Sequence, residues 1–130
     1  MNELEKKSRE MFSILKEHIG EKVFITYWNY GRIISDVEVL QGVIDFERIE
    51  TNRGGIPFIG YGSAIVSIRD ENGKELYKQP LNEPYDVRDS LGIIAYKKKL
   101  FGDDIAREEL ERHNEGERRS RRRKKGIGKY

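Results

Sequence analysis

Apolar residues at helical spacing mark the first segment of the chain. Over residues 2–19 they share one stripe of a helix, with charged side chains on the opposite face. The members of this stripe are Leu4, Met11, Phe12, Leu15, His18 and Ile19. Asn2 suits the N-cap, and Gly20 suits the position after the C-terminus, where a positive φ is favoured. The pattern predicts an amphipathic N-terminal helix within residues 1–20.

From residue 22 the pattern changes to short runs rich in β-branched and aromatic residues, separated by turn residues. These runs predict strands at 22–28, 37–46, 48–51, 64–69 and 75–78. Asn29-Tyr30-Gly31 supplies the first turn, Gly42 marks a bulge or bend, and Asn72-Gly73 fits a type I′ hairpin turn. Four or five short strands with tight turns predict a small, strongly bent sheet or barrel over residues 21–88.

The segment 89–101 fits two different elements. Leu91, Ile94 and Lys98 share one face of a helix, and Asp89 or Ser90 would cap it. The run Gly92–Tyr96 equally fits a last strand. We favour the helix because of the shared face.

Residues 103–113 predict a second helix, with Asp103 as its cap and acidic residues near its N-terminus. Its apolar content is thin, so we expect it to lie on the surface. The predicted fold is therefore mainly β with flanking helices, an α+β protein. Its expected parts are an N-terminal helix (1–20), a small barrel (21–88), a helical extension (89–117) and a basic tail (118–130).

Charge is distributed very unevenly along the chain. The 130 residues include 25 basic and 23 acidic side chains, a formal net charge of +2. The last thirteen residues hold no acid and eight cations: Arg118, Arg119, Arg121, Arg122, Arg123, Lys124, Lys125 and Lys129. Subtracting these leaves 17 basic and 23 acidic groups in residues 1–117, a net charge of −6. We expect a solvated cationic arm that attracts polyanions on a body that repels them.

Composition excludes several classes of protein. Hydrophobic residues are 36% and charged residues 37% of the chain, and no apolar run approaches the roughly 18 to 20 residues of a membrane span. The first ten residues lack the apolar stretch of a secretory signal. We therefore expect a cytoplasmic protein with no membrane partner. The absence of cysteine excludes disulfides, thiolate metal sites and a cysteine nucleophile.

Histidine and carboxylate positions do not predict catalysis. His113 has Glu109 and Glu117 at four-residue spacings, which fits a weak metal clasp but is more typical of a salt-bridged surface helix. The carboxylates Asp36, Asp45 and Asp86 show no spacing that indicates a pair suited to general acid–base chemistry. We expect a nonenzymatic protein without metal or cofactor, and hydrolase or nuclease activity is a minor alternative.

Aromatic side chains form a second group of candidate contact residues: Trp28, Tyr30, Phe58 and Tyr61. Such residues at strand ends stack on bases or hold an extended peptide. For Trp28 we favour packing in or near the core, and Tyr30 is the better surface candidate. The glycine-rich segment 54–62 has neither P-loop nor dinucleotide-binding spacing. As an apolar, partly exposed loop it is our main candidate for a protein-docking segment.

Helix, glycine and strongly bent sheet follow one another in the order found in Sm-like proteins. Three motifs carry the resemblance: Ile19-Gly20-x-x-Val23-x-Ile25, Gly42-Val43-Ile44-Asp45-Phe46 and Gly62-x-x-Ile65-x-x-Ile68. The resemblance to this SH3-type barrel superfamily covers about residues 10–80 and implies a small barrel. Ile49 and Tyr61 stand where the family's uridine pocket uses asparagine and arginine. Uridine-specific binding and an obligate RNA-binding ring are therefore not implied.

Two functions follow from these features. The first is a nonenzymatic accessory protein whose basic arm binds RNA or DNA phosphates without sequence preference, while the barrel docks a protein partner. The second is an interaction or assembly module, an adaptor or oligomeric subunit, whose arm meets an acidic protein surface. Apolar residues on both faces of Lys22–Trp28 favour the second.

Overall fold

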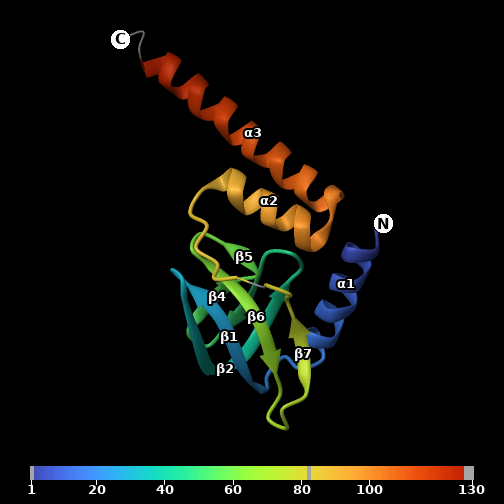
Figure 1. Ribbon diagram of the computed structural model, residues 1–130. Coiled ribbons are helices and arrows are strands. Elements are labelled where there is room, and N and C mark those ends of the chain that lie inside the picture. Colours follow the sequence, from blue (N-terminus) through green and yellow to red (C-terminus); the bar gives the residue numbers. More distant parts are fainter. Residues whose placement is uncertain (1, 82, 128–130) are drawn as a thin grey trace.

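The computed structural model describes residues 2–81 and 83–127, with side chains up to Ser120 (Figure 1). A helix, a seven-stranded antiparallel sheet and two further helices follow in chain order. Their bounds are α1 (Glu3–Lys16), β1 (Lys22–Asn29), β2 (Arg32–Ile44), β3 (Arg48–Thr51), β4 (Gly54–Pro57), β5 (Ile59–Gly60), β6 (Ser63–Arg69), β7 (Glu75–Lys78), α2 (Ser90–Phe101) and α3 (Asp103–Ile127). The α+β class expected from the sequence is confirmed.

The strands pair in the order β4-β3-β2-β1-β6-β5. β5 pairs with the first part of β6, and β7 pairs with the last part of β6 on the same side. β2 is 13 residues long, so its first part pairs with β1 and its last part with β3. The register shifts between Leu40 and Gly42, where a bulge had been expected. Among the described strands no ladder joins β4 to β5, so the structure shows an open sheet and does not show a closed barrel.

The turn between β1 and β2 explains why β2 is longer than the sequence indicated. Tyr30 and Gly31 both adopt positive φ, 52° and 80°, as a two-residue hairpin turn requires. Pairing therefore resumes at Arg32, five residues before the expected start at Val37. At the other end, β2 stops at Ile44 instead of Phe46, because Phe46 (φ 64°) lies in the turn to β3.

The core lies between the sheet, α1 and α2, with Phe12 of α1 at its centre. The Phe12 ring is fully buried and lies 5.1 Å from Phe46 and 4.8 Å from Phe58, measured between ring centroids. Tyr77 of β7 and Phe101 of α2 complete this aromatic cluster at 6.0 and 6.3 Å. One side chain therefore joins α1, two loops of the sheet, an edge strand and α2.

Residues 90–101 form helix α2. The sequence had fitted either a helix or a last strand here, and the helix is the one observed. The Oδ1 atom of Asp89 accepts a hydrogen bond from the backbone N–H of Gly92 at 2.7 Å, so Asp89 is the N-cap. The helix ends at Gly102, whose φ is 104°.

α3 begins at Asp103 as expected but continues to Ile127, well past His113. The residues after His113 are mostly glutamate, arginine and lysine, which have high helix propensity. Ion pairs one turn apart, from Glu108 to Arg112 and from Glu115 to Arg119, add support. Among the described residues, α3 and the other helices all lack the length or the apolar character needed to cross a bilayer.

Candidate functional site

The basic segment expected as a separate arm is the end of α3. Figure 1 shows α3 turning back at the end of α2, on the side of α2 away from the sheet, and then extending away from the rest of the molecule. Arg118 and Arg119 are exposed, and the backbone of Arg121–Lys125 continues the same helix. Lys129 lies outside the described residues. The structure therefore places most of the predicted nucleic-acid-binding cations on an element that projects from the body.

The charge of α3 changes sign along its length. Residues 103–117 contain seven acids and two bases, while residues 118–125 contain seven bases and no acid. This order follows the helix dipole, which favours acids near the N-terminus and bases near the C-terminus. Arg119 Nε lies 3.4 Å from Glu115 Oε1, but an exposed pair of this kind contributes at most about 1 kcal/mol. Within the described side chains, the exposed Arg118 and Arg119 are therefore available to attract anions.

Contacts on the first half of α3 hold it against the body. Lys97 Nζ of α2, whose side chain is 8% exposed, lies 3.0 Å from Glu109 Oε1. Arg112 reaches the loop before β3, with Nη1 3.6 Å from Glu47 Oε1. Below these polar contacts, Ile105 and Ala106 are buried. The direction in which the basic end projects is therefore fixed by packing and ion pairs.

Two of the four predicted aromatic contact residues come together on the surface. Tyr30, in the β1–β2 turn, and Tyr61, in the β5–β6 turn, have ring centroids 6.4 Å apart in an edge-to-face arrangement. Their side chains are 49% and 60% exposed. The guanidinium carbon of Arg88 lies 4.7 Å from the centre of the Tyr30 ring. We call these three residues the Tyr30 cluster.

Arg88 was not expected from the sequence, because no periodicity or motif connects it to the two tyrosines. Asp86 fixes its orientation by accepting hydrogen bonds from Nε and Nη2 at 2.8 and 3.1 Å. These hydrogen bonds raise the pKa of the Arg88 guanidinium, so the group stays charged. The cluster combines an exposed aromatic surface with a fixed cation, which suits stacking on a flat or extended ligand.

Phe58 does not belong to this surface. Its side chain is fully buried between Phe12 and Tyr77, so it has no exposed ring with which to stack on a ligand. Trp28 is half-buried and packs against the core, in line with the packing role favoured from the sequence. The segment 54–62 is also less exposed than expected, because it forms β4 and β5 and buries Phe58 and Ile59.

Carboxylates on the inner side of the sheet have structural partners. The Tyr27 hydroxyl donates to Asp36 Oδ2 at 2.9 Å, and the Thr51 hydroxyl donates to Glu38 Oε1 at 2.8 Å. Burial, together with this bond to Asp36, raises the pKa of Tyr27 to about 12. Over residues 2–81 and 83–127, no three histidine or carboxylate groups gather in a way that would hold a metal ion.

Gly62 is required for the geometry of the Tyr30 cluster. Its φ is +66°, and a Cβ built there would lie 2.6 Å from Tyr30 Cε1. We expect Gly62→Ala to lower the free energy of unfolding by about 1–3 kcal/mol, through strain and displacement of the Tyr30 ring. Urea unfolding measures the loss.

Gly73→Ala is the matched control, because Gly73 has φ +83° but nothing within 4 Å of its Cβ position. The loss of stability in Gly73→Ala therefore measures the cost of backbone strain alone, without a clash like the one with Tyr30. Equal losses in the two variants would show that the contact with Tyr30 does not matter.

Comparisons of the chain with sequence models of known families, with curated proteins and with solved structures gave no match.

Proposed function

We propose that this protein is a nonenzymatic accessory protein that binds RNA or DNA phosphates through the basic end of α3, without sequence preference. The observation that carries this proposal is the position of the cations. They lie at the far end of a helix whose first half carries seven acids and two bases and is held against the rest of the chain (Figure 1). A long polyanion therefore meets the cations before it meets the acids.

The chemistry of the segment suits phosphate. Each arginine presents a planar fork of N–H donors that matches phosphate oxygens, and the density of cations suits the charge spacing of a nucleic-acid backbone. Arginine and lysine side chains contact phosphate oxygens whatever the base sequence, and for this reason we propose binding to the backbone alone.

Two further surfaces fit the docking of a protein partner, as the second part of this proposal. The Tyr30 cluster is one. The other is the outer face of β1 and β2, where Phe24, Ile33 and Val37 are 45%, 58% and 50% exposed. Phe24 and Val37 are direct cross-strand partners, so they form a continuous apolar surface.

This apolar surface also favours the second candidate function, an assembly module with no nucleic-acid role. In that case the end of α3 would bind an acidic protein surface. A small SH3- or Sm-like barrel remains the finer proposal for the fold, and it rests on the register shift in β2 between Leu40 and Gly42 and on the motif resemblance.

A salt titration distinguishes the two functions. Fluorescence anisotropy would measure binding to labelled single-stranded and duplex oligonucleotides of about 20 nucleotides, at salt concentrations from about 50 to about 300 mM. For the full chain we expect a log–log slope near −5, since about six cations would contact phosphates. A chain ending at Glu117 should lose this binding. Equal, salt-insensitive binding by both chains would contradict the proposal and favour the assembly module.

A further inference from the structure

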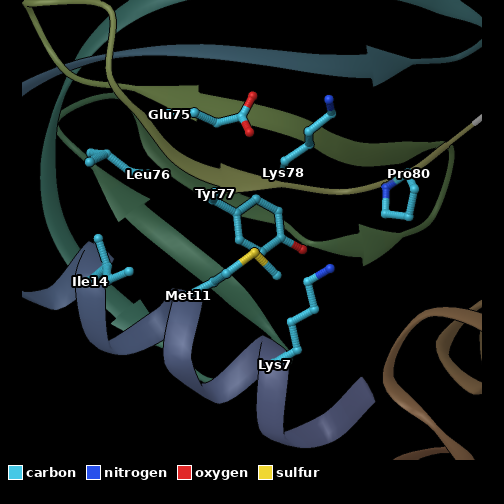
Figure 2. Close-up of a pocket in the computed structure, with 8 residues that line it drawn as sticks. All are labelled: Lys7, Met11, Ile14, Glu75, Leu76, Tyr77, Lys78 and Pro80. Atoms are coloured by element: carbon cyan, nitrogen blue, oxygen red, sulfur yellow. The ribbon is translucent and has the colours of Figure 1, made fainter. Parts of the chain in front are cut away.

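A groove runs between α1 and the edge strand β7. It has a volume of about 460 Å³. Figure 2 shows Lys7, Met11 and Ile14 rising from α1 on one side, with β7 on the other. Pro80 closes one end. No contact assigned to the proposed nucleic-acid interface involves this region.

The groove follows the edge of the sheet rather than one face of it. All four residues of β7, Glu75–Lys78, line it. Side chains of a strand alternate between two faces, so consecutive lining residues indicate a groove along the strand itself. Among the described strands β7 pairs only with β6, which leaves its outer edge open.

The register identifies backbone groups that are free to bind a further strand. Gln79 donates its backbone N–H to Val66 O at 2.7 Å, and Lys78 is the partner of Ser67. In an antiparallel ladder the backbone groups of successive residues point to opposite sides. The N–H and C=O groups of Lys78 therefore point away from β6, toward the side where another strand would pair.

The rim of the groove is cationic although the body as a whole is acidic. Lys7 and Lys78 line it, and Lys99 lines a smaller adjoining pocket that shares both lysines. Over the described part of the chain, none of these three lysines has a carboxylate within 4 Å. The one acid in the lining, Glu75, lies 4.0 Å from Arg69. The floor is apolar, from Met11, Ile14 and Leu76.

Two buried polar side chains at this place lack partners. Tyr77 lines the groove and Gln79 lines the adjoining pocket, and they are 1% and 2% exposed. Within the described residues, the Tyr77 hydroxyl and the Gln79 Nε2 atom have no hydrogen-bond partner. Unpaired polar groups at this depth are unusual in folded proteins.

We propose that this groove binds an extended peptide segment of a partner protein that is apolar in one half and acidic in the other. The peptide adds a strand to the edge of β7, a mode in which main-chain hydrogen bonds supply affinity and side-chain pockets supply specificity. Its apolar side chains pack on Met11, Ile14 and Leu76, and its carboxylates lie beside Lys7 and Lys78 at the Pro80 end (Figure 2). The four residues of β7 span roughly 13 Å, so four to about six peptide residues fit.

The test uses a fluorescein-labelled octapeptide with valines in one half and glutamates in the other, with binding to the full-length protein followed by anisotropy. The Lys7→Glu/Lys78→Glu variant should bind it about tenfold more weakly or worse. The matched control is Lys6→Glu/Lys74→Glu, which changes the net charge equally at exposed lysines of α1 and the β6–β7 turn that do not line the groove. This control should bind within about twofold of the original protein.

A second pair of variants tests the main-chain contact. Lys78→Pro removes a backbone N–H that points away from β6 and makes no hydrogen bond to it, whereas Lys78→Ala keeps this N–H. Lys78→Pro should bind the peptide about fivefold more weakly than Lys78→Ala. A peptide N-methylated at alternate residues should also bind more weakly, and this readout does not depend on the folding of any variant.

Other results would overturn the inference. Equal loss in the two double lysine variants would show a general charge effect. Equal binding of the same peptide with lysine in place of glutamate would show that the charge of the ligand does not matter. Loss of oligonucleotide binding in Lys7→Glu/Lys78→Glu would assign the groove to nucleic acid. Loss of self-association in the same variant would make the occupant a second copy. Because α3 is untouched, failure here leaves the nucleic-acid proposal standing.

Discussion

Reversing the charge of Arg121, Arg122 and Arg123 to glutamate is expected to weaken oligonucleotide binding by about a hundredfold or more at roughly 0.1 M salt. Each lost phosphate contact removes close to one unit from the log–log salt slope, so the slope should fall from near −5 to about −2 or −3. The three arginines lie on the part of α3 that extends from the body (Figure 1). Anisotropy titrations over a range of salt concentrations measure both quantities.

The control places the same change in net charge on the body, at Lys22, Arg32 and Lys74. All three side chains are exposed, and over the described residues none forms an ion pair within 4 Å. Binding by this control should change by less than about fivefold, because the effect is then general and screened by salt. If the body variant loses as much affinity as the α3 variant, net charge rather than the basic end of α3 governs binding.

Phe12→Ala should cause the largest loss of stability from a single substitution, about 3–5 kcal/mol in the free energy of unfolding. Phe12 is fully buried, and its ring contacts Phe46, Phe58, Tyr77 and Phe101. Its removal leaves a cavity where α1, the sheet and α2 meet, so no single element can move to fill it. Urea unfolding followed by circular dichroism measures the change.

Phe24→Ala provides the comparison with the same chemistry on the outer face of β1. Phe24 is 45% exposed and belongs to no buried cluster, so its loss should cost less than about 1 kcal/mol. Similar losses at both positions would mean that the core is not centred on Phe12. A loss at Phe24 well above this value would instead indicate that the apolar outer face is covered, as in an oligomer.

Features that depend on neighbouring residues were predictable from the sequence. Asn2 caps α1, with its Oδ1 atom accepting from the Glu5 N–H at 2.8 Å. The Asn72-Gly73 turn connects β6 to β7, and β3 and β7 have the expected bounds. These signals work because capping, turn geometry and strand alternation are set by residues within a few positions of one another.

Features that depend on pairing between distant segments were not predictable in the same way. Tyr30 and Tyr61 were both expected as contact residues, but only the strand register shows that they meet, and nothing local indicated Arg88. Phe58 was misplaced because a glycine-rich neighbourhood is typical of an exposed loop, whereas here it forms two short strands over the core. The groove beside β7 also depends on which strand lies at the edge, which alternation along one segment cannot reveal.

The anchoring of α3 has a geometric consequence for any complex. Among the described residues the last ion pair with the body is at Arg112, and a helix rises 1.5 Å per residue, so the basic residues 118–125 lie roughly 9–20 Å farther along the axis. A nucleic acid bound there would be held at a stand-off distance comparable to the width of a DNA duplex. The sheet would then remain accessible, and one molecule would have room to bridge a nucleic acid and a second protein at the same time.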